Sequence, residues 1–254
     1  MNPQKITVGK ANSQREIAVR QRMGSNPGLV WLGGYRSDMI GTKAEALDTY
    51  ATDKGLSCLR HDYSGHGESG GKFIDGTISR WLEESLAVFE QFSKGPQILV
   101  GSSMGAWVAL RMAQELVALG KTDRLQGLLL LAPAPDFTHE LMMPQLSDEM
   151  KADLETKGYM EEPSEYSDEP NIFTMALFDD GEKNRVMTGP INTGCPVHIL
   201  QGMQDPDVPY QHAMRLCEFL PSDNVTMTLV KDGDHRLSRE QDISLILKTL
   251  ERMI

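Results

Sequence analysis

A serine lies at the centre of a Gly-x-Ser-x-Gly pattern, Gly101-Ser102-Ser103-Met104-Gly105. The apolar run Ile98-Leu99-Val100 precedes this pattern, and residues at helical spacing follow it directly. This order predicts a buried strand, a sharp turn at Ser103 and then a helix, which leaves the serine exposed above the edge of a sheet. Such a turn brings backbones so close that glycine is favoured at both flanking positions. Ser103 is therefore the candidate nucleophile, and Ser102, which is not central between the glycines, is the less suitable alternative.

A serine hydroxyl needs a histidine to take its proton and a carboxylate to hold that histidine in one tautomer. Two later positions supply these groups: Asp205 follows a predicted strand at residues 195–200, and His235 follows a predicted strand at residues 225–230. Asp207 is the alternative acid, but the Gly-x-x-Asp spacing from Gly202 favours Asp205. We therefore expect Asp205 and His235 to complete a triad with Ser103.

The other histidines are interpreted as structural or surface residues, although His66 could approach the site. His235 is preferred as the base because it alone follows the final predicted strand. His61 and His66 lie beside and in the 62–69 loop, and His198 lies in a predicted strand. His139 lies in the 133–190 segment, and His212 lies in a predicted helix.

Strands and helices alternate along most of the chain, which is typical of right-handed βαβ units. Strands are predicted at residues 28–32, 56–60, 98–100, 125–131, 195–200 and 225–230, and an edge strand includes residues 17–20. Helices are predicted at residues 42–54, 77–93, 104–119 and 210–220, and a last helix begins near Ser238. Two capping boxes, Thr42-x-x-Glu45 and Ser238-x-x-Gln241, indicate where the first and last helices start. The fold class is therefore α/β, with a doubly wound, mainly parallel sheet that binds ligands at the carboxyl ends of its strands.

The alternation lapses over residues 133–190. This segment contains 14 Asp and Glu but only 4 Lys and Arg, together with six of the 15 methionines. Helical fragments are expected near residues 147–157. We interpret the segment as a small helical cap inserted over the strand ends; the alternative is an acidic, solvated excursion without contact to the site. The chain is thus expected to form one domain, 1–254, with a cap at about 133–190.

Composition narrows the class of protein further. The net charge of −11 argues against nucleic acid or an anionic membrane as the main partner, and no apolar run reaches the roughly 20 residues that span a bilayer. The three cysteines are scattered, which indicates neither a disulfide framework nor a zinc site. The N-terminus is polar, without the apolar core of a signal peptide. We expect a cytoplasmic monomer or homodimer that acts on a small-molecule ester or acyl substrate, without metal or organic cofactor.

Four motifs taken together resemble the α/β-hydrolase family from about Gly28 to the C-terminus, and the order Ser, Asp, His matches that family. They are Gly101-Ser102-Ser103-Met104-Gly105, Asp62-x-x-Gly65-x-Gly67-x-Ser69, Gly202-x-x-Asp205-x-x-Val208-Pro209 and Gly233-Asp234-His235. Within the superfamily, the chain resembles the family of α/β-hydrolase domain-containing protein ten. The matching segments are Gly34-Tyr35-Arg36-Ser37-Asp38-Met39, Gly41-Thr42-Lys43-Ala44, residues 62–65, residues 95–103 and Asp234-His235-Arg236. That resemblance implies hydrolysis of carboxylic esters and thioesters, including palmitoyl-protein thioesters and acyl glucuronides.

An oxyanion hole needs two backbone N–H groups near the serine. Met104 supplies one, because it follows the nucleophile at the start of a helix. The other is expected from Gly33-Gly34-Tyr35, which resembles the His-Gly-x turn of the family with Gly33 in place of the histidine. The N–H of Tyr35 is the preferred donor, and Gly34 is the close alternative.

The sequence therefore predicts a serine hydrolase that cleaves carboxylic esters, thioesters included, through an acyl-enzyme. In this mechanism Ser103 attacks the carbonyl carbon, His235 transfers the proton and Asp205 orients His235. A serine peptidase or amidase of the same fold is one alternative. A non-catalytic ligand-binding relative is another, but such a protein has no need of all three groups. Because the cap is acidic, neutral or apolar acyl groups are expected over polyanionic ones.

Overall fold

The computed structural model describes residues 3–163, 169–220 and 224–254 and contains one eight-stranded sheet in the order β1-β2-β4-β3-β5-β6-β9-β10. The strands are β1 (Gln4–Val8), β2 (Arg15–Arg22), β3 (Ser25–Leu32), β4 (Leu56–His61), β5 (Gln97–Ser102), β6 (Leu125–Leu131), β9 (Val197–Gly202) and β10 (Val225–Val230). In this sheet β4, β3, β5, β6, β9 and β10 pair in parallel in that order, whereas β1 pairs antiparallel with β2 and β2 pairs antiparallel with β4. The predicted α/β fold with a mainly parallel sheet is confirmed.

The predicted edge strand is only partly correct. Residues 17–20 lie in β2, as expected, but β2 occupies the second position in the sheet. The outer position belongs to β1, which pairs with β2 so that Ile6 lies opposite Ile17. β1 was not predicted because its residues are mostly polar and exposed, as an edge strand allows.

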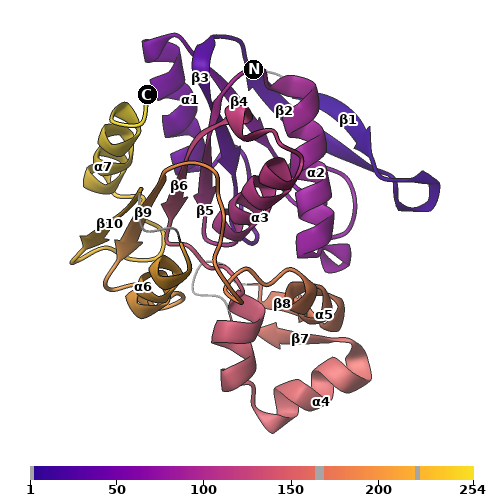
Figure 1. Cartoon of the computed structure of the whole chain (residues 1–254). Helices are drawn as coiled ribbons and strands as arrows, with labels where there is room; N and C mark the ends of the chain where they lie inside the picture. Colours follow the sequence, from indigo (N-terminus) through magenta and orange to yellow (C-terminus); the bar gives the residue numbers. More distant parts are fainter. Residues whose placement is uncertain (1–2, 164–168, 221–223) are drawn as a thin grey trace.

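Helices cover both faces of the sheet (Figure 1). The helices are α1 (Thr42–Lys54), α2 (Ile78–Phe92), α3 (Met104–Ala118), α6 (Tyr210–Phe219) and α7 (Glu240–Glu251). Alternate β5 residues point to opposite faces: Ile98 and Val100 pack in the cluster that includes α1 and α7, and Leu99 packs with α2, α3 and α6. This two-sided burial explains why the central strands are apolar throughout.

Both predicted capping boxes are wrong. Gly41 caps α1 without a side-chain bond, so Thr42 is already the first helical residue. α7 starts at Glu240 after Arg239, whose backbone N–H donates to the Asp242 carboxylate at 3.1 Å. Ser238 is instead used in the preceding loop, where its hydroxyl donates to the Arg236 carbonyl.

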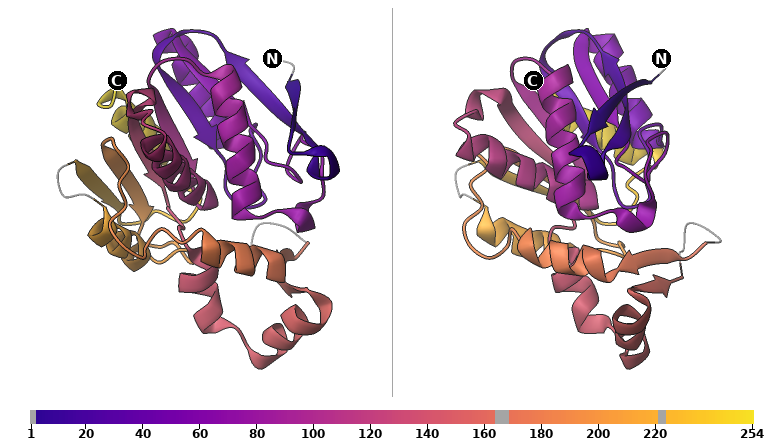
Figure 2. Two further views of the ribbon diagram at one scale, coloured as in Figure 1. Left: turned by 45° about the vertical axis from the view of Figure 1, so that its right-hand side comes forward. Right: turned by 90° about the vertical axis from the view of Figure 1, so that its right-hand side faces the viewer.

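The segment between β6 and β9, here called the cap, lies beyond the end of the sheet (Figures 1 and 2). It contains α4 (Asp148–Lys157), β7 (Tyr159–Glu162), β8 (Asn171–Thr174) and α5 (Met175–Lys183). α4 matches the helix expected near residues 147–157. The antiparallel pair of β7 and β8 was not expected, because both strands are only four residues long and carry no clear alternation.

Among the described residues, no helix is long and apolar enough to cross a bilayer.

Candidate active site

Ser103 lies in the connection between β5 and α3, at the carboxyl end of a central strand. Its φ is +54° and its ψ is −119°, a conformation that residues with a side chain rarely adopt. The Ser103 N–H donates to the Leu131 carbonyl of β6 at 2.9 Å, which holds the strained residue in place. The sharp strand-to-helix turn predicted from the sequence is present.

The two flanking glycines are required by close backbone contacts. A Cβ at Gly105 would lie 2.1 Å from the Leu32 carbonyl oxygen of β3, and one at Gly101 would lie 2.5 Å from the Gly105 oxygen. Neither contact can be relieved by moving a flexible side chain, because each involves backbone. The close packing of α3 on β3 and β5 thus depends on glycine at both positions.

Ser103, His235 and Asp205 are joined by hydrogen bonds although they are far apart in the sequence. The His235 Nε2 lies 3.0 Å from the Ser103 Oγ, and the His235 Nδ1 lies 2.8 Å from the Asp205 Oδ2. The Asp205 side chain is fully buried, and the His235 side chain is 15% exposed. In this arrangement the Nδ1 proton is directed to the carboxylate, so the Nε2 can accept the serine proton.

The carboxylate of Asp205 is held by several donors besides His235. Its Oδ1 accepts the N–H groups of Val208 and Asp207 at 2.7 and 2.9 Å, and its Oδ2 accepts the side-chain amide of Gln201 at 3.0 Å. Of the two candidate acids, Asp205 therefore faces His235, whereas Asp207 is exposed and contributes a backbone donor. Gln201, which is fully buried, was not predicted; its only sequence signal is a polar side chain near the end of an apolar strand, four residues before the acid.

The histidine loop is packed against the end of β9. A Cβ at Gly202 would lie 2.4 Å from the Gly233 oxygen, so glycine allows the two loops to meet. The Lys43 ammonium of α1 donates to the Arg236 carbonyl, next to His235. Burial lowers the pKa of Lys43 to about 8. α1 thus holds the loop directly after the histidine.

A turn at residues 34–37 lies beside the serine. A Cβ at Gly34 would lie 3.4 Å from the Ser103 Cβ, and the Ser37 N–H closes the turn on the Gly34 oxygen at 3.2 Å. Met104 begins α3, so its amide is at the positive end of a helix. Among bonds between described backbone groups, neither the Tyr35 nor the Met104 amide is used. The role of the Tyr35 and Met104 amides as oxyanion donors, with Gly34 as the alternative to Tyr35, stays a prediction.

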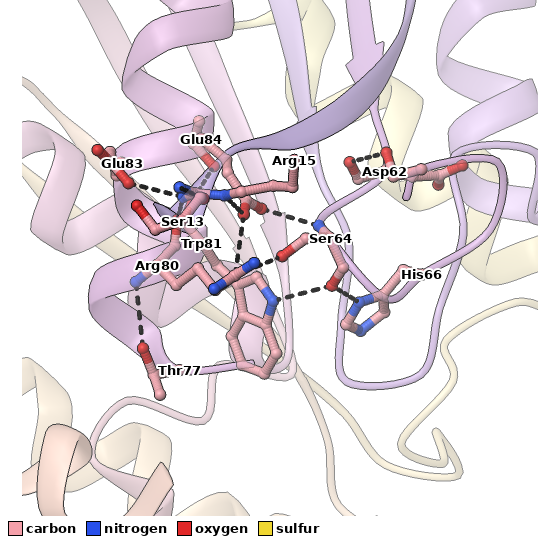
Figure 3. A network of polar contacts seen from close by, with 12 residues as sticks. Ser13, Arg15, Asp62, Ser64, His66, Thr77, Arg80, Trp81, Glu83 and Glu84 are labelled. Carbon is pink, nitrogen blue, oxygen red and sulfur yellow. Dashed lines mark hydrogen bonds and ion pairs between the residues drawn. The ribbon is translucent and has the colours of Figure 1, made fainter. Parts of the chain in front are cut away.

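The loop at residues 62–69, whose Asp62, Ser64 and His66 are drawn in Figure 3, contacts this turn through His66. The His66 Nε2 accepts the Arg36 N–H at 3.2 Å, and its Nδ1 lies 3.2 Å from the Ser64 oxygen. Burial lowers the pKa of His66 to about 4, so the ring is neutral and can accept that bond. The backbone N–H of Ser64 is in turn bonded to the buried Glu84 carboxylate at 2.8 Å. His66 therefore contacts the 34–37 turn, where the sequence analysis expected only that it could approach the site.

The Asp62 carboxylate organises the same loop. It accepts the Met39 N–H at 2.6 Å and the Glu68 N–H at 2.7 Å, while burial raises its pKa to about 6. A Cβ at Gly67 would lie 2.2 Å from this carboxylate. The Asp-x-x-Gly-x-Gly pattern is thus explained by a folded loop, with no contact to Ser103 required.

The remaining histidines have partners outside the triad. His61 bonds to the Ser85 hydroxyl at 3.1 Å, His212 to the Pro135 carbonyl at 2.9 Å, and His139 to the Glu182 carboxylate at 2.9 Å. His198 is half-buried in β9. These contacts are those of structural and surface residues.

Asp205, Asp207 and His235 could in principle hold a metal ion, because one potential ligand atom of each lies within 4.8 Å of the others. Both Asp205 oxygens, however, already accept N–H groups, and the His235 Nδ1 is bonded to one of them. These hydrogens point at the lone pairs that a cation would need. The group fits a hydrogen-bonded acid–histidine pair better than a metal centre.

Comparison with known proteins agrees with this architecture. A model of the "Alpha/beta hydrolase family" matches residues 27–243. "Palmitoyl-protein thioesterase ABHD10, mitochondrial" from Homo sapiens is 33% identical over 240 residues, which are 94% of this chain and 76% of that protein. The protein of the same name from Pongo abelii is 34% identical over 240 residues, with the same coverage.

Two solved structures are also similar over nearly their full lengths. A putative hydrolase from Agrobacterium vitis S4 is 57% identical, with a TM-score of 0.97 over 100% of this chain and 98% of that chain. Alpha/beta hydrolase domain-containing protein 10 from mouse is 29% identical, with a TM-score of 0.85 over 98% of both chains. The fold, the family model and these relatives agree, and the chain belongs to the α/β-hydrolase family.

Proposed function

We propose that this protein is a serine hydrolase that cleaves carboxylic esters and thioesters through an acyl-enzyme. The observation that carries the proposal is the continuous hydrogen-bonded path from the Ser103 hydroxyl through His235 to the buried Asp205 carboxylate. Relatives named as thioesterases support hydrolysis as the type of reaction. A ligand-binding protein without activity would have no use for this combination.

The proposed reaction uses only residues of this chain. The Ser103 Oγ attacks the substrate carbonyl as His235 Nε2 takes its proton, and the Asp205 carboxylate stabilises the resulting imidazolium. The amides of Tyr35 and Met104 bind the oxyanion, with the Gly34 amide as the alternative to Tyr35. His235 then gives the proton to the leaving alcohol or thiol. Water, activated in the same way, releases the acid from Ser103.

Neutral or apolar acyl substrates are proposed over polyanionic ones. A cavity of about 460 Å³ lies between the 34–37 turn, the 62–69 loop and the cap. Three carboxylates, those of Asp38, Glu161 and Glu169, line it together with one cation, Arg36. Ser103, Asp205 and His235 do not line this cavity, but an anionic substrate that approaches the site along this face would meet net repulsion, which adds to the acidic character of the cap.

The test compares Ser103→Ala with Ser102→Ala on p-nitrophenyl acyl esters and on matched acyl thioesters of increasing chain length. Ser103→Ala is expected to abolish turnover, while Ser102→Ala retains it because Ser102 lies in β5. The chain-length series then gives the preferred acyl group. Substantial turnover by Ser103→Ala would contradict the proposal. A cytoplasmic location and a monomeric or homodimeric state stay predictions.

A further inference from the structure

The 34–37 turn fixes the direction of the amide that we propose as an oxyanion donor. The Gly34 carbonyl and the Tyr35 N–H belong to one peptide group, and in a trans peptide they point in opposite directions. The bond from the Ser37 N–H draws the Gly34 oxygen into the turn. The Tyr35 N–H therefore points out of the turn. Its direction depends on the contacts that fix the conformation of residues 34–37.

Arg36 occupies a position in this turn that favours glycine. Its φ is +55°, while Tyr35 is not among the residues with positive φ, as in a turn whose third residue is left-handed. An arginine side chain gains nothing locally from this conformation. The Arg36 N–H is bonded to His66, which stabilises the backbone from the core side. The side chain of Arg36 extends in another direction.

The Arg36 guanidinium binds the two cap residues directly before β8, Glu169 and Pro170. It donates to the Pro170 carbonyl and to the Glu169 carbonyl, the latter at 3.3 Å. It also forms an ion pair with the Glu169 carboxylate at 3.1 Å. Two backbone carbonyls and one carboxylate from a single cap segment thus converge on one side chain of the turn.

Tyr35 makes a second link to the cap, in β8 itself. Its hydroxyl donates to the Ile172 carbonyl, and its ring stacks on Phe173 with centroids 4.9 Å apart. An edge contact to Phe73 at 4.8 Å holds the ring from the other side. Burial raises the pKa of the phenol, so the group stays a hydrogen-bond donor. Adjacent residues of the turn are therefore both anchored to β8 or to the two residues directly before it.

We propose that the side chains of Tyr35 and Arg36 are positioning groups, through which the cap holds the 34–37 turn in the conformation that presents an oxyanion donor to Ser103. This inference rests on the proposed function, because it gives the cap a role in that reaction. Negative charge develops on the carbonyl oxygen only as the transition state forms. A displaced donor should therefore weaken transition-state binding much more than substrate binding.

The experiment measures Arg36→Met, Tyr35→Phe and the double variant on a short p-nitrophenyl ester. Each protein is also titrated with a trifluoromethyl ketone, which forms an oxyanion adduct with the serine, and with the matched methyl ketone, a ground-state analogue. We expect each single variant to lose about tenfold in kcat with KM within about twofold, because complete loss of a donor costs about 100- to 1,000-fold. The trifluoromethyl ketone should bind about tenfold more weakly, and the methyl ketone equally well.

Arg185→Met is the matched control. Arg185 is 20% exposed at its side chain, compared with 28% for Arg36, and it pairs with Glu140 and Glu182 without touching the turn. This variant should keep the parental ratio of the two inhibitor affinities. Arg36→Lys, which can still reach a cap carbonyl, should recover part of the kcat lost in Arg36→Met.

The outcomes separate this inference from the function on which it rests. If the parent hydrolyses esters through Ser103 but Arg36→Met and Tyr35→Phe keep the parental kcat and inhibitor ratio, the positioning role is wrong. The positioning role is also wrong if the variants bind both ketones more weakly by the same factor, since a general distortion of the pocket would have that effect. A parent without Ser103-dependent turnover overturns the proposed function and this inference together.

Discussion

Asp205 and Asp207 belong to the same short turn, yet their carboxylates have different surroundings. Asp205 is buried and accepts hydrogen bonds from His235, Gln201 and two backbone amides. Asp207 is exposed and donates its own N–H to Asp205. Replacing each aspartate in turn therefore tests which of the two carboxylates acts on His235.

Replacing Asp205 by asparagine is expected to lower kcat on the order of 10³ to 10⁴-fold, because the amide can hold His235 in the wrong tautomer. Asp207→Asn keeps the backbone donor and should stay within about twofold of the parent. Steady-state kinetics on one ester measures both variants. Equal losses in the two would show that the identity of the acid is wrong.

The three side chains that the structure joins by hydrogen bonds could be predicted from the sequence as a candidate triad, because each follows a recognisable strand. Ser103 has its own pattern, and Asp205 and His235 come at the ends of later strands. The supporting residues could not be predicted, since their roles arise from contacts between distant segments. Arg36 has no local signal for its bonds to the cap, and Gln201 reads as part of a strand.

At the scale of elements, the site depends on how closely α3 approaches β3. The Gly105 contact with the Leu32 oxygen sets this distance and with it the placement of Ser103 near the 34–37 turn. Gly189, by contrast, has no atom within 4 Å of the position that a Cβ would take. An added methyl group would therefore clash with backbone at Gly105 and meet open space at Gly189.

Gly105→Ala should lower the free energy of unfolding by about 3 kcal/mol or more and remove ester turnover, because backbone atoms have to separate to admit the methyl group. Gly189→Ala should change the free energy of unfolding by no more than about 0.5 kcal/mol. Urea denaturation and an ester assay measure both effects. A Gly105→Ala variant as stable and active as Gly189→Ala would refute the packing argument.

The alternation of strands and helices was predictable because the central strands are buried on both faces and therefore continuously apolar. β1, β7 and β8 were not, since a short or mostly exposed strand has a weak hydrophobic pattern. The predicted start of the last helix was wrong for a related reason. Ser238 resembles an N-cap in the sequence, but its hydroxyl donates to the Arg236 carbonyl in the histidine loop. Local patterns fail where a tertiary contact competes for the same side chain.

For the whole molecule, negative charge is concentrated in the segment at residues 133–190, which contains the proposed cap. The cavity between the 34–37 turn and the cap has three carboxylates and one guanidinium among its lining groups. Matched neutral and anionic esters of one acyl length should therefore differ in kcat/KM by at least about tenfold in favour of the neutral ester. The difference should shrink as ionic strength rises. Equal values at low salt would contradict this prediction.

Fold stability is also expected to depend on pH through buried histidines. Burial lowers the pKa of His61 from 6.5 to about 4, so the unfolded chain binds more protons than the folded protein between these values. The free energy of unfolding should therefore fall as the pH decreases through this window. Between pH 7.5 and 5 the parent should lose about 2 kcal/mol more than His61→Leu. Urea denaturation at the two pH values measures this difference, and identical losses in both proteins would contradict it.

The central claim is that Ser103 forms an acyl-enzyme. The most direct measurement combines stopped-flow release of p-nitrophenol with intact-mass and peptide analysis of rapidly quenched protein. The expected result is an initial release that approaches one equivalent per active site, with the mass of one acyl group on the peptide that contains Ser103. Hydrolysis without an acylated Ser103, or hydrolysis that persists in Ser103→Ala, would contradict the account.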